Sequence, residues 1–174
     1  MTWEVEDELL AEMATWEPLP SESDPRWDDE SRESDELWAH ADRVLAAARM
    51  AGERGWLRVA VRGFEYAADW DLHGGMQGIR HGPEKAFMAV PDGLATFARE
   101  LEPLSRHPRA GTRLWTVREL GILRQVSSLP YLMGRLDDEH AGVAAEALNS
   151  LHMLAQEHPE AAAEVARIEA ARQG

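Results

Sequence analysis

Histidines and carboxylates are the side chains of this chain that could support acid–base or metal chemistry. The seven histidines lie at positions 40, 73, 81, 107, 140, 152 and 158, and none forms an HxH or HExxH arrangement. A helix end could gather Asp69, Asp71 and His73 around a metal ion. A metal site needs three or four ligands in a fixed geometry, so we interpret these three residues as part of an exposed helix end. We therefore expect no metal ion.

Other catalytic motifs are also missing from the sequence. The glycine-rich stretch 73–82, HGGMQGIRHG, lacks the GxxxxGK[ST] order and follows no predicted strand, which favours a loop over a phosphate cradle. No GxSxG motif is present, and the absence of cysteine excludes thiol chemistry and disulfides. Asp28 and Asp29 lie in a proline-rich segment that is poorly suited to hold two carboxylates at a fixed separation. We expect no catalytic activity and no cofactor.

Charge is strongly segregated along the chain. Residues 1–36 contain 14 of the 32 acids and two of the 18 bases, a net charge of −12, whereas the other 138 residues carry 18 acids and 16 bases. Trp3, Trp16 and Trp27 lie within this acidic arm, and Trp38 follows it. Charge steers an encounter and aromatic rings anchor it, so the arm is suited to a basic protein partner. The residues predicted to contact that partner are Trp16, Trp27, Asp28, Asp29, Glu30, Trp70 and Asp71.

A basic stretch between residues 99 and 124 offers the arm a second destination. Exposed charges interact over only about 8 Å at physiological salt, so whatever compensates the arm must lie close to it. The arm therefore docks either on this stretch or on a partner, and the sequence leaves both open. Direct nucleic-acid binding is disfavoured because the arm would repel phosphates, although a basic patch here is compatible with it. The arginines of the stretch are Arg99, Arg106, Arg109, Arg113 and Arg118, with Arg124 at its end.

The elements that would position these residues are predicted to be helices. Apolar residues recur at helical spacing in nearly every segment from Ser34 onward, and no segment alternates with period two, so the fold class is all-α. We expect residues 1–33 to be an arm and linker, with a short amphipathic helix at 4–14, and 34–174 to be one helical-repeat domain. Trp38, Trp56, Trp115, Leu120, Leu132, Leu148 and Leu151 are expected in the core. The predicted helices are 35–51, 56–70, 84–90, 94–105, 112–124, 129–136, 139–156 and 159–172.

Two stretches of the second half look like one unit written twice. They are TRLWTVRELGIL at 112–123 and GVAAEALNSL at 142–151, separated by SLPYLMGRLDDEH at 128–140. Together they resemble bacterial HEAT-like repeats, in which a helix of the form LPxLxxxLxD precedes a second helix rich in Ala and Leu. Arg113 matches the usual arginine of the second helix in the first copy, whereas Ala141 stands there in the second. The resemblance covers residues 94–156 and implies a short α-solenoid that binds another macromolecule.

These features together favour a non-catalytic binding protein. The N-terminal sequence MTWEVEDELL lacks the features of a signal peptide, and no apolar run reaches the roughly 18 residues of a membrane span, so we expect a cytoplasmic protein without membrane contact. The leading hypothesis is an inhibitor or immunity-type protein that neutralises a basic partner, such as a nuclease. The alternatives are a scaffold or adaptor of a larger protein assembly and, less favoured, a nucleic-acid-binding HEAT-like protein.

Overall fold

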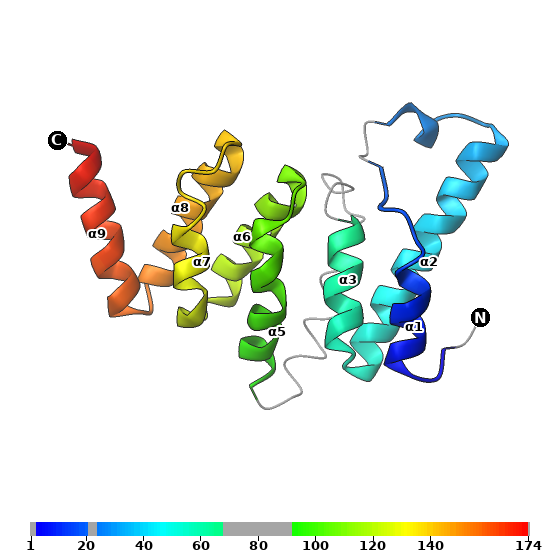
Figure 1. The fold of residues 1–174 in the computed structure, drawn as a ribbon, viewed down its shortest axis with the longest axis horizontal. Helices are drawn as coiled ribbons and strands as arrows, with labels where there is room; N and C mark the ends of the chain where they lie inside the picture. Colours follow the sequence, from blue (N-terminus) through cyan, green and yellow to red (C-terminus); the bar gives the residue numbers. More distant parts are fainter. Residues whose placement is uncertain (1–2, 21–23, 68–91, 174) are drawn as a thin grey trace. The chain divides into compact units, whose positions relative to one another are not determined.

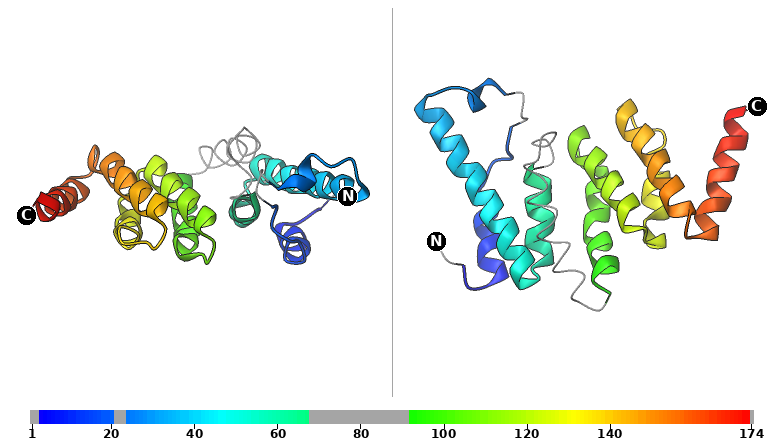
Figure 2. Two further views of the ribbon diagram at one scale, coloured as in Figure 1. Left: turned by 90° about the horizontal axis from the view of Figure 1, so that it is seen from above. Right: turned by 180° about the vertical axis from the view of Figure 1, so that it is seen from behind.

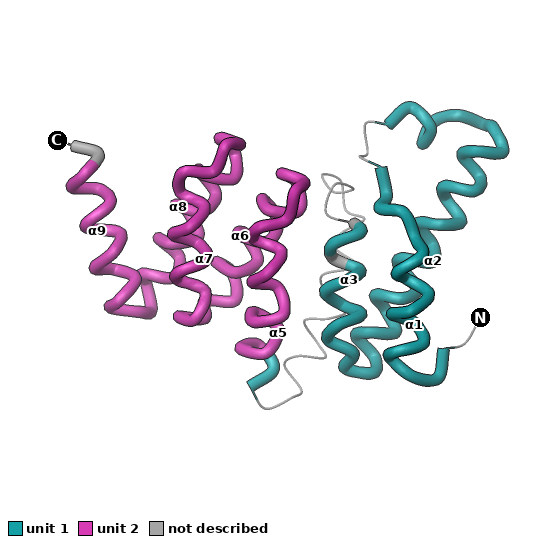
Figure 3. Tube along the Cα trace, in the orientation of Figure 1, with its two compact units in different colours: residues 1–93 teal, residues 94–174 magenta. Residues whose placement is uncertain are grey.

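Helices make up most of the described part of the chain. The computed structural model describes residues 3–20, 24–67 and 92–173, and it contains no strand among them (Figure 1). The all-α prediction is therefore confirmed for these residues. The chain divides into two compact units, residues 1–93 and residues 94–174 (Figure 3). The predicted division into an arm and linker at 1–33 and one helical-repeat domain at 34–174 stays a prediction.

Unit 1 is built around the long helix α2. It contains α1 (Glu6–Met13), the 3-10 turn η1 (Pro25–Trp27), α2 (Arg32–Arg54) and α3 (Leu57–Ala67). Ser31 caps the start of α2, where its Oγ accepts a hydrogen bond from the Ser34 amide at 3.4 Å. Gly55 ends the helix in the left-handed conformation with φ of 69°, which glycine adopts without a steric penalty. Both α1 and α2 pack against α3 (Figure 1).

The apolar side of the acidic arm is buried within unit 1. Leu9, Met13 and Leu19 are almost completely inaccessible to solvent. The Tyr66 hydroxyl of α3 donates to the Met13 carbonyl oxygen at 2.6 Å, and the Leu19 amide donates to the Tyr66 carbonyl oxygen at 3.2 Å. The predicted helix at 4–14 is thus confirmed as α1. It is held on α3 by packing and by hydrogen bonds at its C-terminal end.

Unit 2 arranges its helices in two layers. Its elements in chain order are α5 (Gly93–Leu101), η2 (Glu102–Arg106), α6 (Ala110–Leu123), η3 (Val126–Ser128), α7 (Leu129–Met133), α8 (Ala141–Ala155) and α9 (Pro159–Gln173). Seen from above, α5 and α7 lie in one layer, and α6 and α8 lie in the other (Figure 2). Within the second layer α8 packs against α6 on one side and against α9 on the other.

A close helix crossing holds α6 against α8. A Cβ atom placed on Gly121 would lie 2.5 Å from the Ser150 Oγ and 2.9 Å from the Ser150 Cα, both shorter than any normal contact. The Ser150 hydroxyl donates across the crossing to the Val117 carbonyl oxygen at 2.8 Å. Glycine on α6 and serine on α8 are therefore what allow the two backbones to approach so closely.

Four of the seven residues predicted in the core are confirmed as buried, and the other three are exceptions. Leu120, Leu132 and Leu151 are fully buried and Trp115 is 8% exposed, whereas Trp56 is half-buried. The prediction for Leu148 is wrong in degree, because the buried stripe of α8 passes through Ala147 and leaves Leu148 half-buried.

Trp38 is the third exception, and its predicted burial is wrong. Its side chain is 48% exposed. The buried stripe of α2 runs through Ser34, Ala41, Val44 and Ala48, and Trp38 falls about a quarter-turn away from that line. The predicted helix at 84–90 lies outside the described residues.

Candidate functional site

An exposed acidic patch lies at the start of α2. We use this name for Asp28, Asp29, Glu30 and Asp35, all of which are exposed. The N-terminal half of α2 extends beyond the ends of α1 and α3 and is joined there by η1 (Figure 1). First-turn acids also stabilise a helix N-terminus, so part of this charge serves the helix itself.

The turn that precedes the patch is locked by an aspartate–arginine pair. The Asp24 carboxylate accepts hydrogen bonds from the Arg26 guanidinium at 2.8 and 2.9 Å and from the Arg26 amide at 3.0 Å. The side-chain hydrogen bonds from Arg26 are the main reason that the pKa of Asp24 falls from 3.8 to about 2. This turn fixes η1 and therefore the point at which the patch begins.

Among the described residues of unit 1, the arginines that form ion pairs do so with acids outside the patch. Arg58 pairs with Glu6 at 3.0 Å and with Asp7 at 2.8 Å. Arg26 and Arg32 pair with Asp24, Glu33 and Glu36. Within the described residues no ion pair involves any member of the acidic patch. Its carboxylates are thus available to a cation from outside the chain.

The exposure of the two tryptophans beside the patch is the reverse of the prediction. Trp27, predicted to contact a partner, is only 8% exposed and packs edge-on against Trp38, with ring centroids 4.8 Å apart. The Trp38 indole N–H donates to the Trp27 carbonyl oxygen at 3.3 Å. Trp27 is therefore enclosed by its own unit, and Trp38 is the exposed ring at this position.

Trp16 contributes to the docking of the arm on its own unit. It lines an open depression of about 350 Å³ together with Glu12, Thr15, Glu17, His40 and Arg43. The His40 ring meets Trp16 edge-on at 5.7 Å, and the Arg43 guanidinium lies over the indole at 5.8 Å. The His40 Nε2 atom is 2.7 Å from the Glu17 carbonyl oxygen, which joins α2 to the arm. Trp70 and Asp71, also predicted to contact a partner, lie outside the described residues.

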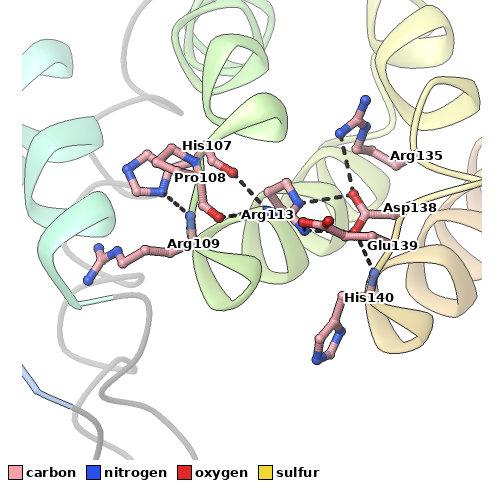
Figure 4. A network of polar contacts seen from close by, with 8 residues as sticks. All are labelled: His107, Pro108, Arg109, Arg113, Arg135, Asp138, Glu139 and His140. Carbon is pink, nitrogen blue, oxygen red and sulfur yellow. Dashed lines mark hydrogen bonds and ion pairs between the residues drawn. The ribbon is translucent and has the colours of Figure 1, made fainter.

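A second polar cluster lies in unit 2 and is centred on Arg113 (Figure 4). Its guanidinium is buried, and it donates to the Asp138 carboxylate from Nε at 3.0 Å and from Nη2 at 2.8 Å. Its Nη1 atom donates to the carbonyl oxygens of His107 and Pro108 at 3.0 and 2.9 Å. Every nitrogen of the guanidinium is therefore used within the unit.

The electrostatics of this cluster are those of a strong internal ion pair. The side-chain hydrogen bonds from Arg113 lower the pKa of Asp138, and the backbone amide of His140 adds to the effect, whereas burial opposes it. The same contact with Asp138 raises the pKa of Arg113. Arg135 and Glu139 complete the network at 3.3 and 3.2 Å. The cluster ties the turn before α6 to the turn before α8, and its groups are committed to structure.

The arginines of the predicted basic stretch differ in exposure, and their use as a docking surface stays a prediction. Arg113 is buried, as described above. Arg106 lies over the Tyr131 ring at 5.9 Å, and Arg118 lies over the Trp115 ring at 5.0 Å. Arg109 is half-buried and Arg99 is exposed. Periodicity alone did not reveal that Arg113 points inward, although its match to the repeat pattern was a signal for it.

Metal binding and membrane insertion are two further properties that bear on function. The described residues contain no group of three or more His, Cys, Asp or Glu placed to hold a metal ion, and Asp69, Asp71 and His73 lie outside them. None of the described helices is both long enough and apolar enough to cross a bilayer. Comparison of the chain with protein-family models, curated proteins and solved structures found no match.

Proposed function

We propose that this protein is a non-catalytic binding module whose acidic N-terminal unit binds a basic protein partner. In this proposal it acts in the cytoplasm as an inhibitor or immunity-type protein, and a basic nuclease is the kind of target that an acidic surface would occupy. The observation that carries the proposal is the acidic patch, which is exposed and takes part in no ion pair among the residues that the structure describes.

The structure supports different roles for the apolar and the acidic residues of the arm. Its apolar residues Leu9, Met13 and Leu19 are buried within unit 1, whereas Asp28, Asp29 and Glu30 are exposed. The arm thus docks on its own unit through one side and presents charge on the other. A preformed acidic surface accelerates association with a basic partner and loses little conformational entropy on binding.

We further propose that unit 2 is a short HEAT-like solenoid. The two layers of helices and the packing of α8 between α6 and α9 support this assignment. So does the pair formed by Arg113 and Asp138, because both residues stand at the arginine and aspartate positions of the resembling repeats. A scaffold role is the second candidate, and the division of the chain into two compact units favours it.

The experiment is a quantitative affinity purification from the cells in which the protein is made. The wild type is compared with a variant that carries Asp28→Asn, Asp29→Asn and Glu30→Gln. A control variant carries Glu100→Gln, Asp137→Asn and Glu160→Gln, which are exposed acids of unit 2 with the same total charge change. The proposal predicts that a basic protein co-purifies with the wild type and with the control but not with the first variant. The same basic protein, once purified, should bind the wild type directly. Equal recovery with both variants would contradict it.

A further inference from the structure

The ring of Trp38 is an exposed aromatic surface held in a fixed position. Its indole N–H is hydrogen-bonded to the Trp27 carbonyl oxygen, and the two rings meet in a T-shaped contact with centroids 4.8 Å apart. Nearly half of the side chain nevertheless remains accessible to solvent. Such a ring is already ordered before any partner arrives, so its use in binding has a small entropic cost.

The surroundings of Trp38 are acidic on both sides along α2. Asp35 precedes it by three residues and Asp42 follows it by four, so both share its face of the helix. Both aspartates are exposed, and neither has an ion pair among the described residues. Asp28 follows Trp27 directly, next to the carbonyl group that holds the Trp38 indole.

Other tryptophans of this chain show what such a ring accepts. An arginine guanidinium lies over Trp16, over Trp56 and over Trp115, at 5.8, 4.8 and 5.0 Å from the ring. Trp38 is more exposed than any of these, yet no cation of the described residues lies over it. A planar guanidinium both stacks on an indole and forms paired hydrogen bonds with a carboxylate, which an ammonium group cannot do.

We propose that Trp38, flanked by Asp35 and Asp42, receives an arginine side chain of the basic partner. This inference rests on the proposed function and deepens it, because it makes the acidic unit selective for arginine over lysine. Charge alone would not distinguish the two residues. Trp38 therefore acts as the specificity-determining residue of the acidic patch.

The experiment compares fluorescently labelled nona-arginine and nona-lysine peptides, which have the same charge, by anisotropy at two salt concentrations. We expect the wild type to bind nona-arginine roughly three- to thirtyfold more tightly. Trp38→Leu keeps the apolar cover on Trp27 and should abolish this preference, whereas Trp38→Phe should retain part of it. The matched control is Trp56→Leu, since Arg54 already occupies the Trp56 ring, and this variant should keep the full preference.

The outcomes separate failure of this inference from failure of the proposed function. Equal affinity of the wild type for both peptides, or a preference for nona-arginine that survives in Trp38→Leu, overturns the inference. The proposed binding of a basic partner by the acidic patch would then still stand. Absence of salt-dependent binding by either peptide contradicts the proposed function itself. If circular dichroism shows that Trp38→Leu does not fold, indole ¹⁵N spectra of the wild type test the inference instead. Nona-arginine must then shift the Trp38 resonance more than the other indoles, and an unmoved Trp38 resonance overturns the inference.

Discussion

Replacing Arg113 by leucine should destabilise unit 2 severely. The side chains of Arg113 and Asp138 are only 5% and 2% exposed. Removing one partner of a buried pair strands the other charge and costs about 3–5 kcal/mol. Asp138 would keep Arg135 at 3.3 Å and the His140 amide at 3.0 Å, so we expect a loss near 3 kcal/mol, the lower end of that range.

The assay has to separate the two units. Urea denaturation followed by circular dichroism gives the free energy of unfolding, and hydrogen exchange locates the change. Amides of α6 and α8 should lose protection, whereas those of α1–α3 should not. The control is Arg167→Leu, which removes an exposed arginine paired with Glu164 and should cost under about 1 kcal/mol. A loss below about 1 kcal/mol for Arg113→Leu would refute the role assigned to the buried pair.

Two further predictions concern the same unit. Gly121→Ala should lower the free energy of unfolding by roughly 1–3 kcal/mol, because the new Cβ meets the Ser150 backbone. The control Gly134→Ala should be almost neutral, since the nearest contact of its new Cβ is an ordinary 3.4 Å. Equal effects of the two variants in urea denaturation would argue against the close crossing. The pKa of Asp138 is lower in the folded state than its ordinary 3.8, so its contribution to stability is present above about pH 3.8 and is lost as the pH falls toward the folded value. Asp138→Asn should therefore flatten the acid limb of the stability curve, and an unchanged slope would contradict the assignment.

The sequence was most informative where a single physical cause determined the structure. Apolar spacing located the helices because burial requires one apolar face, and the predicted segments 112–124, 139–156 and 159–172 correspond to α6, α8 and α9. The burial of Leu120, Leu132 and Leu151 followed from the same cause. Boundaries were less well predicted: α2 begins at Arg32, three residues before the predicted start, because Ser31 provides the N-cap.

Predictions that required knowledge of a neighbouring element were less successful. Trp38 lies next to an apolar stripe, but whether it is buried depends on the turn at η1, where Trp27 takes the inner position. The role of Gly121 was not predicted, since a close crossing is visible only when Ser150 is known to face it. The inward orientation of Arg113 similarly depends on Asp138, which is 25 residues away in the sequence.

The measurement that tests the central claim most directly is the association rate of this protein with its purified basic partner. Stopped-flow rates should be determined at low and at physiological salt for the wild type and for the Asp28→Asn, Asp29→Asn, Glu30→Gln variant. If the acidic patch steers the encounter, the variant should associate roughly three- to tenfold more slowly at low salt, and its rate should depend less on salt, with thermal stability unchanged. An unchanged rate and salt dependence would contradict the claim that this surface is where the partner binds.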